Sequence, residues 1–160
     1  GAADPLLTQM LVDYLCGYAG SPQEQEISRS VVRTIIVGNT VEANKVPSQQ
    51  MDAKQQQKVV SPLRQLDLVL TQLVASMPVD VMPGANDFSN NCLPQAPLHP
   101  CVVPSSASYT SCNFTSNPHA FDIENVQFLG TSGQNVDDVR LYSSLEDPVD
   151  ILESMMTWQH

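Results

Sequence analysis

The order strand, helix, strand in the first half of the chain is the feature that most constrains its fold. A β-branched run, "VVRTIIVGN", stops at Gly38, and a second apolar run, "PVDVMPG", stops at Gly84. Between them, "SPLRQLDLVLTQLVASM" has leucines at helical spacing, and Ser61 and Pro62 are predicted to cap it and open its first turn. A right-handed crossover of this kind makes the two strands parallel, with both carboxyl ends at one edge of a sheet. Ligands of open α/β sheets bind beyond that edge, so both glycine turns lie where a site is expected.

The rest of the chain also alternates between predicted helices and short strands. Residues 4–17 predict an amphipathic helix, capped by an aspartate before a proline and ended by a glycine. Residues 21–30 are polar and predict a connector, and the Gln-rich residues 41–60, broken by Pro47, predict a polar surface excursion. The later predicted elements are the strands "SCNFTSN", "HAFDI" and "NVQFLGTSG" and the helices "NVDDVRLYSS", entered from Asn135, and "DPVDILESMMTWQ", entered from Asp147. The predicted fold class is therefore α/β.

Composition and charge exclude several classes of function. The chain has 160 residues, 42% of them hydrophobic, which suits one globular domain. Its formal net charge of −10 repels phosphate backbones and anionic membranes, so direct nucleic-acid binding is not favoured. No window has the length and hydropathy of a membrane span, and the first residues lack the basic region of a signal peptide.

The four cysteines do not form a metal motif. Cys16, Cys92, Cys101 and Cys112 include no CxxC pair, and no histidine has finger-like spacing from them. We therefore predict free buried thiols. Three of the four fall close together in the sequence, which leaves a disulfide open.

Three strand-ending turns are predicted to converge at the sheet edge: residues 38–39, residues 83–87 and residues 131–135. In metal-dependent hydrolases such turns present carboxylates and imidazoles to a dinuclear metal centre. Here Asn39 offers a neutral oxygen where two cations need an anionic bridge, Ala85 cannot ligate, and Ser132 is a poor substitute for imidazole. The turns stand at a site position without the residues that the chemistry needs.

Two long strings give the chain a resemblance to a known family. They are "PVDVMPGANDFSNNCLPQAPLHPC" and "FLGTSGQNVDDVRLYSSLEDPVDILE". Both are similar to the small, B-type regulatory subunits of eukaryotic replicative DNA polymerases, most of all to the DNA polymerase delta branch. The resemblance covers nearly the whole chain. It implies a partial calcineurin-like metallophosphoesterase fold, with β-sheet layers flanked by helices.

The same resemblance implies a degenerate metal site. Active members of the wider fold carry Gly-Asp, Gly-Asn-His-Asp and His-Gly motifs after successive strands. Here Asn39 stands for the aspartate of the first motif, and Ser132 stands for the histidine of the third. In the second motif Ala85 and Asn86 replace the asparagine and the histidine, while Asp87 is kept. Because several ligands are lost together, the resemblance implies no catalytic residue, no metal, no cofactor and no hydrolase activity.

The resemblance also implies that residues 1–160 are a single but incomplete phosphoesterase-like domain. Members of the family begin with an oligonucleotide-binding (OB) type barrel and end with further phosphoesterase strands, and this sequence has neither. We therefore expect unpaired strand edges and marginal stability for the isolated residues.

The function that the resemblance implies is that of a noncatalytic scaffold. Such a chain would be an accessory subunit of a DNA-directed DNA polymerase, in the nucleus, in DNA replication and repair. The implied partners are the C-terminal domain of the catalytic subunit and the third accessory subunit, with DNA met only through the complex and no membrane. An active metal-dependent phosphoesterase or nuclease is the alternative. A nucleic-acid-binding module is a third hypothesis, which the charge disfavours.

Several polar side chains near the turns have two interpretations. His99, between prolines, fits hydrogen-bonded structure better than a metal ligand. Asp87 fits a cap of its own loop better than a residue left over from a metal site. Asn39, Asn86 and Asn135 are predicted to accept hydrogen bonds from backbone amides at the strand ends.

The remaining histidines and the end of the chain carry weaker expectations. His119 and His160 are expected to be exposed, and no role is assigned to them. Residues 155–158, which include two methionines and the tryptophan, form either a partner surface or core, and core is favoured.

Overall fold

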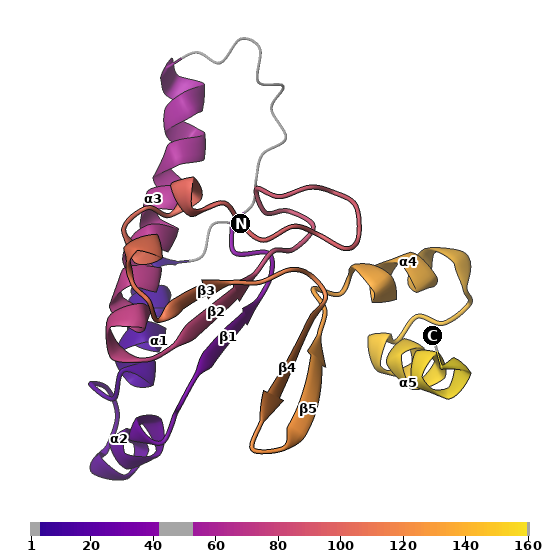
Figure 1. The fold of residues 1–160 in the computed structure, drawn as a ribbon, viewed down its shortest axis with the longest axis horizontal. Helices are drawn as coiled ribbons and strands as arrows, with labels where there is room; N and C mark the ends of the chain where they lie inside the picture. Colours follow the sequence, from indigo (N-terminus) through magenta and orange to yellow (C-terminus); the bar gives the residue numbers. More distant parts are fainter. Residues whose placement is uncertain (1–3, 42–52, 160) are drawn as a thin grey trace.

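The computed structural model describes residues 4–41 and 53–159 and shows a mixed α/β protein (Figure 1). Its centre is a three-stranded parallel sheet in the order β1-β2-β3, formed by β1 (Thr34–Val37), β2 (Val79–Met82) and β3 (Cys112–Phe114). The register places Val37 beside Met82, so β1 and β2 end together. The predicted α/β class and the shared carboxyl edge of the first two strands are confirmed.

Two helices pack beside this sheet, α1 (Pro5–Leu15) and α3 (Ala53–Ser76) (Figure 1). The centre of the core is a cluster of side chains that are at most 4% exposed: Val79 and Val81 of β2, with Leu70, Leu73 and Val74 of α3. Burial of each of these side chains stabilises the folded state by about 2 kcal/mol. Leu68, predicted on the same inward face of the helix, is exposed instead.

The predicted caps of the first and last helices are confirmed. The side chain of Asp4 accepts a hydrogen bond from the backbone N of Leu6 at 2.9 Å at the start of α1. In the same way Asp147 accepts from the backbone N of Val149 at 2.8 Å at the start of α5 (Pro148–Trp158). In each case a proline follows the cap, where its missing N–H has no helical partner to lose.

The prediction of a polar connector at residues 21–30 is wrong, because a helix, α2 (Pro22–Arg29), occupies it. A capping box starts this helix: Ser21 Oγ accepts from the backbone N of Glu24 at 3.4 Å, and Glu24 Oε2 accepts from the backbone N of Ser21 at 2.6 Å. These hydrogen bonds, the backbone one first, lower the pKa of the Glu24 carboxyl. The helix has one large apolar residue, so its hydrophobic periodicity is almost absent.

The helix predicted to begin at Ser61 begins earlier, at Ala53, and Pro62 lies inside it. Residues 53–60 are therefore helical, and the prediction of a surface excursion is wrong for them. It is also wrong for Val41, which is buried, while residues 42–52, with the proline break, lie outside the described residues. A proline inside a helix removes one backbone hydrogen bond, and the packed leucines after it hold the helix against the sheet.

An antiparallel hairpin, β4 (His119–Ile123) and β5 (Val126–Gly130), lies outside the parallel sheet (Figure 1). Glu124 and Asn125 join its strands with φ values of 50° and 67°, as a two-residue hairpin turn of type I′ requires. The strands predicted at these positions are confirmed. They pair with each other and not with the strands of the main sheet.

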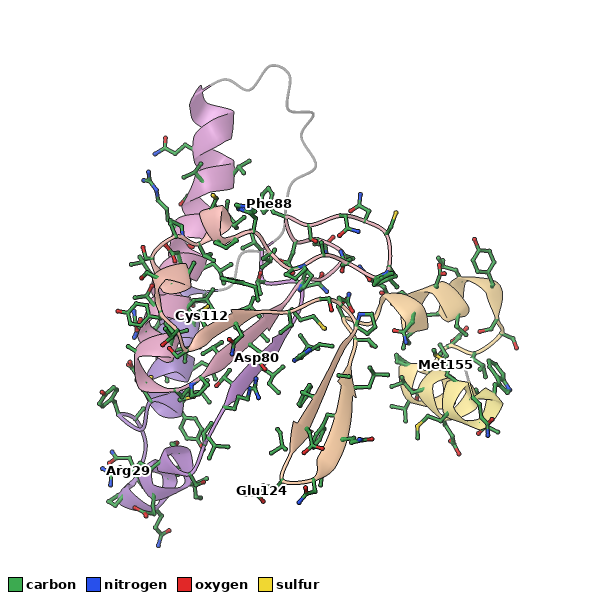
Figure 2. The ribbon with its side chains drawn as sticks, in the orientation of Figure 1. Arg29, Asp80, Phe88, Cys112, Glu124 and Met155 are labelled. Atoms are coloured by element: carbon green, nitrogen blue, oxygen red, sulfur yellow. The ribbon has the colours of Figure 1, made fainter. Side chains whose placement is uncertain are left out.

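A buried carboxylate connects the hairpin to the sheet. Asp80 of β2 is fully buried and points toward the hairpin (Figure 2). Its Oδ2 lies 2.6 Å from Arg33 Nη2 and 3.6 Å from His119 Nε2, and its Oδ1 accepts from Asn113 Nδ2 at 3.1 Å. The expectation that His119 is exposed is wrong, because this side chain is 19% exposed and stacks on Phe121. His160 lies outside the described residues.

The last two helices, α4 (Gln134–Tyr142) and α5, pack on each other to one side of the hairpin (Figure 1). Ile151 of α5 is fully buried, and Val136 of α4 is nearly so. Met156 and Trp158 are exposed and Met155 is half-buried, so the prediction that residues 155–158 are core is wrong for the larger part of the segment.

All four cysteines are free, as predicted, but none is fully buried. Cys92 and Cys101 are exposed, while Cys16 and Cys112 are half-buried, and burial raises the pKa of the Cys112 thiol. Over residues 4–41 and 53–159, no helix has the length and apolar character to cross a membrane. In the same residues β1 and β3 each pair with a strand on one side only, so each has an unpaired edge. The expected marginal stability of the isolated residues stays a prediction.

Candidate functional site at the carboxyl edge of the sheet

The three strand-ending turns meet at the carboxyl edge of the sheet, as predicted. Gly38 has a φ of +85°, and a Cβ added to it would lie 2.8 Å from Gly84 Cα and 2.8 Å from Ser132 Cβ. A Cβ on Gly84 would collide with the backbone N of Asn39 and would lie 2.7 Å from Asn39 Oδ1. Since side chains do not tolerate such distances to backbone atoms, both positions require glycine. The turns after β1, β2 and β5 are thus in direct contact.

Asp87 is the carboxylate that the described residues bring to this edge, and it is 6% exposed. Its Oδ2 accepts a hydrogen bond from the backbone N of Gly84 at 2.8 Å, which is the loop cap predicted for it. Its Oδ1 accepts from Thr40 Oγ1 at 2.6 Å and from the backbone N of Val41 at 3.0 Å. The carboxylate therefore ties the turn after β2 to the turn after β1.

The asparagines of the turns take part in different ways. Asn39 has a φ of 55°, and its Oδ1 accepts from the backbone N of Asn86 at 3.2 Å, the predicted role. The same role predicted for the Asn86 side chain is wrong, because Asn86 contributes its backbone N–H to this bond, and its own side chain and that of Ala85 are exposed. Asn135 Oδ1 accepts from Thr131 Oγ1 at 3.2 Å, so its predicted bond to a backbone amide is replaced by one to a hydroxyl.

A buried network of side-chain amides joins the second turn to the third. Asn117 Nδ2 lies 2.7 Å from Ser132 Oγ, 2.8 Å from Gln95 Oε1 and 3.2 Å from Gln134 Oε1. Gln95 Nε2 donates to the carbonyl of Gly84 at 3.1 Å. Gln95 and Asn117 are each 1% exposed. Sequence reasoning missed both, because they come from irregular loops and no local pattern distinguishes them from other loop amides.

Side chains also hold the far part of the loop between β2 and β3. Asp67 of α3 accepts from the backbone N of Ser106 at 2.8 Å and from that of Ser105 at 3.0 Å. Burial raises the pKa of the Asp67 carboxyl, but the hydrogen bonds from the two serines outweigh burial, so its pKa is lowered. His99 Nδ1 accepts from the backbone N of Cys101 at 3.2 Å, the structural role predicted for this histidine.

These contacts do not fit a dinuclear metal centre. Two dications need several carboxylate or imidazole ligands, and one carboxylate must bridge them. The oxygens of Asp87 already accept three hydrogen bonds, Ala85 has no ligand atom, and Ser132 bonds to an amide. Residues 4–41 and 53–159 contain no group of three His, Cys, Asp or Glu residues placed to hold a metal ion. The described side chains of this edge form hydrogen bonds between the loops.

The fold and this edge define a class: an α/β protein with a parallel sheet, in which turns at a typical ligand-binding edge bond to one another. Comparison with known proteins identifies the family. The model of the DNA polymerase alpha/epsilon B-subunit family matches residues 2–160, so the chain belongs to this family. The resemblance inferred from the sequence is confirmed.

Three relatives within this family are similar to the chain over most of its length. The DNA polymerase delta small subunit of Oryza sativa subsp. japonica is 42% identical over 98% of this chain and 37% of the relative. The protein of the same name from Arabidopsis thaliana is 40% identical over 99% of this chain and 37% of the relative. The DNA polymerase delta subunit 2 of Drosophila melanogaster is 35% identical over 89% of this chain and 34% of the relative. The chain thus spans little more than a third of the length of these relatives.

Proposed function

We propose that the chain is part of the small subunit of DNA polymerase delta and acts there as a noncatalytic scaffold. In this role it connects the C-terminal domain of the catalytic subunit to the third accessory subunit, in the nucleus, in DNA replication and repair. The relatives named above support the assignment to the delta subunit. The scaffold role takes its support from the carboxyl edge of the sheet.

One observation carries the noncatalytic part of the proposal. The carboxylate of Asp87 accepts hydrogen bonds from Gly84, Thr40 and Val41 and is nearly buried. The loops thus use three of the about four lone-pair positions of this carboxylate, whereas a dinuclear centre needs several anionic ligands and access for a substrate. Asn39, Ala85, Asn86, Asp87 and Ser132 are accordingly interpreted as positions of a degenerate metal site, of which Asn39, Asp87 and Ser132 now bond to neighbouring loops.

Co-purification tests the scaffold role. The full polypeptide that carries this chain is expressed with the C-terminal domain of the catalytic subunit, and the expected result is a complex that stays together through size-exclusion chromatography. If the two elute separately, the scaffold role is wrong.

A hydrolysis assay tests the alternative, an active metal-dependent phosphoesterase. With manganese and a phosphodiester substrate, we expect no turnover above the background without protein. Asp67→Ala is a matched control for Asp87→Ala, because Asp67 is also a buried carboxylate that bonds loop amides but lies away from the edge. Turnover that is lost in Asp87→Ala and kept in Asp67→Ala would overturn the noncatalytic assignment.

A further inference from the structure

The α4–α5 pair carries an exposed apolar face that the proposed function does not yet use. On α5, Val149, Leu152 and Met156 are 68%, 45% and 81% exposed. Their spacing of three and four residues places them on one face of the helix, which we call the α5 stripe. The buried face of α5 is a different one, on which Ile151 is fully buried. The stripe is therefore not required for the contact between the two helices.

The same pair concentrates the negative charge of the chain. Residues 134–159 hold six carboxylates against one arginine, a net charge of −5 and half of the −10 of the whole chain. Glu153 lies four residues after Val149 and three before Met156, so it borders the α5 stripe, and Asp150 lies one turn before it. Both side chains are exposed. The surface thus combines apolar side chains with an acidic border.

Charge decides which molecule can cover this surface. Nucleic acid and anionic lipid are repelled by the acidic border, and a second copy of the chain would bring five negative charges against five. A segment with lysine or arginine beside apolar side chains is attracted by the border and buries the stripe. An exposed helical stripe of this kind fits an amphipathic helix, which presents its own apolar residues at the same spacing.

We propose that the α5 stripe and its acidic border form the docking surface for a basic amphipathic helix of another subunit of the polymerase complex. This inference rests on the proposed function, since it names the surface through which the scaffold holds one of its partners. The apolar stripe supplies most of the affinity, and the carboxylates set the orientation and the salt dependence.

Substitution of the stripe tests the inference in the full polypeptide, co-expressed with the catalytic subunit and the third accessory subunit. Leu152→Glu combined with Met156→Glu is expected to lower the retention of one partner by about tenfold. Ile27→Glu combined with Leu129→Glu is the control, because these side chains are equally exposed apolar residues elsewhere and the charge change is the same. The control complex is expected to stay intact.

A charge test uses the border alone. Asp150→Lys combined with Glu153→Lys is expected to weaken the same partner, and the weakening should shrink as the salt concentration rises. Glu26→Lys combined with Glu124→Lys changes the net charge by the same amount on exposed side chains and is expected to leave the complex unchanged. Equal behaviour of the two charge variants would count against the proposed partner chemistry.

Hydrogen exchange separates a partner from other occupants. Amides of residues 148–158 are expected to exchange about tenfold more slowly in the complex than in the free full polypeptide. Equal exchange in both would mean that no partner covers the stripe, and a dimer of the free protein that the stripe variant abolishes would identify a second copy. Either result overturns the inference.

The outcomes also separate this inference from the proposed function. If the unsubstituted protein retains both partners and the stripe variant does too, the docking surface is wrong and the scaffold role stands. If the unsubstituted protein retains neither partner, the scaffold role fails and the docking surface fails with it.

Discussion

At the carboxyl edge of the sheet the buried polar side chains bond to other groups of the same chain, whereas the charged side chains of the α4–α5 pair are mostly carboxylates exposed to solvent. Asp87, Gln95 and Asn117 are at most 6% exposed, and each has partners within its own chain. Asp150 and Glu153 are exposed beside apolar side chains that the described residues do not cover. Buried polar groups at the edge are thus satisfied within the chain, while the helix pair leaves apolar and charged side chains together in solvent.

The substitution expected to lower stability most breaks the contact between the turns at the edge. Gly38→Ala places a methyl group 2.8 Å from Gly84 Cα and forces alanine into a φ of +85°. Left-handed backbone and overpacking together cost about 3.5 kcal/mol in the free energy of unfolding. Urea denaturation measures this loss of stability.

Gly133→Ala is the control for this substitution. Gly133 has a φ of +88°, but a Cβ there would meet no atom within 4 Å. Only the backbone strain remains, so about 1.5 kcal/mol is expected. If the two variants lose the same stability, the turns are not in the close contact described above.

A smaller effect is expected when the carboxylate of the edge is removed. Asp87→Ala leaves the buried N–H of Gly84 and of Val41 without an acceptor, at a cost of about 2.5 kcal/mol in the free energy of unfolding. Thermal or urea denaturation measures the loss. A change below the error of the measurement would show that these amides find other partners.

The edge was predictable in its position and only partly in its bonds. Gly38 and Gly84 end β-branched runs around a helix, and the crossover rule places such turns together. The caps Asp4 and Asp147 were predictable from the sequence because each precedes a proline and an apolar helix. Gln95 was not predictable, since its partners lie in loops that the chain path brings together over long sequence separations.

Two errors in the predicted fold have a common physical cause. The capping box of Ser21 and Glu24 and the helical turns before Pro62 are local backbone features of polar segments. Hydrophobic periodicity cannot detect them, because both segments contain few apolar residues. The exposure of the α5 stripe was not predicted for the opposite reason. An apolar helix face is predicted as core unless tertiary packing shows otherwise.

The third prediction concerns the support of the loop that leads to the edge, and it depends on pH. Asp67→Asn replaces one acceptor oxygen with a donor that faces the N–H of Ser105 or Ser106, so about 1.5 kcal/mol of stability is lost at neutral pH. The folded pKa of Asp67 is lowered from 3.8, so its contribution is present above 3.8 and is lost as the pH falls through the folded value. The difference between Asp67→Asn and the unsubstituted protein should therefore shrink in acid. A difference that stays constant across that range would contradict the role of the ionised carboxylate.

The smallest change in stability is expected for substitutions in the α5 stripe. Leu152→Ser and Met156→Ser remove side chains that are already in solvent, so each should change the free energy of unfolding by less than about 0.5 kcal/mol. Ile151→Ala, one position along the same helix, removes a fully buried side chain and should cost about 3 kcal/mol. Denaturation of the three variants under one set of conditions measures both. If Leu152→Ser were as costly as Ile151→Ala, the stripe would belong to the core of this protein, and its retention for a partner would lose its physical basis.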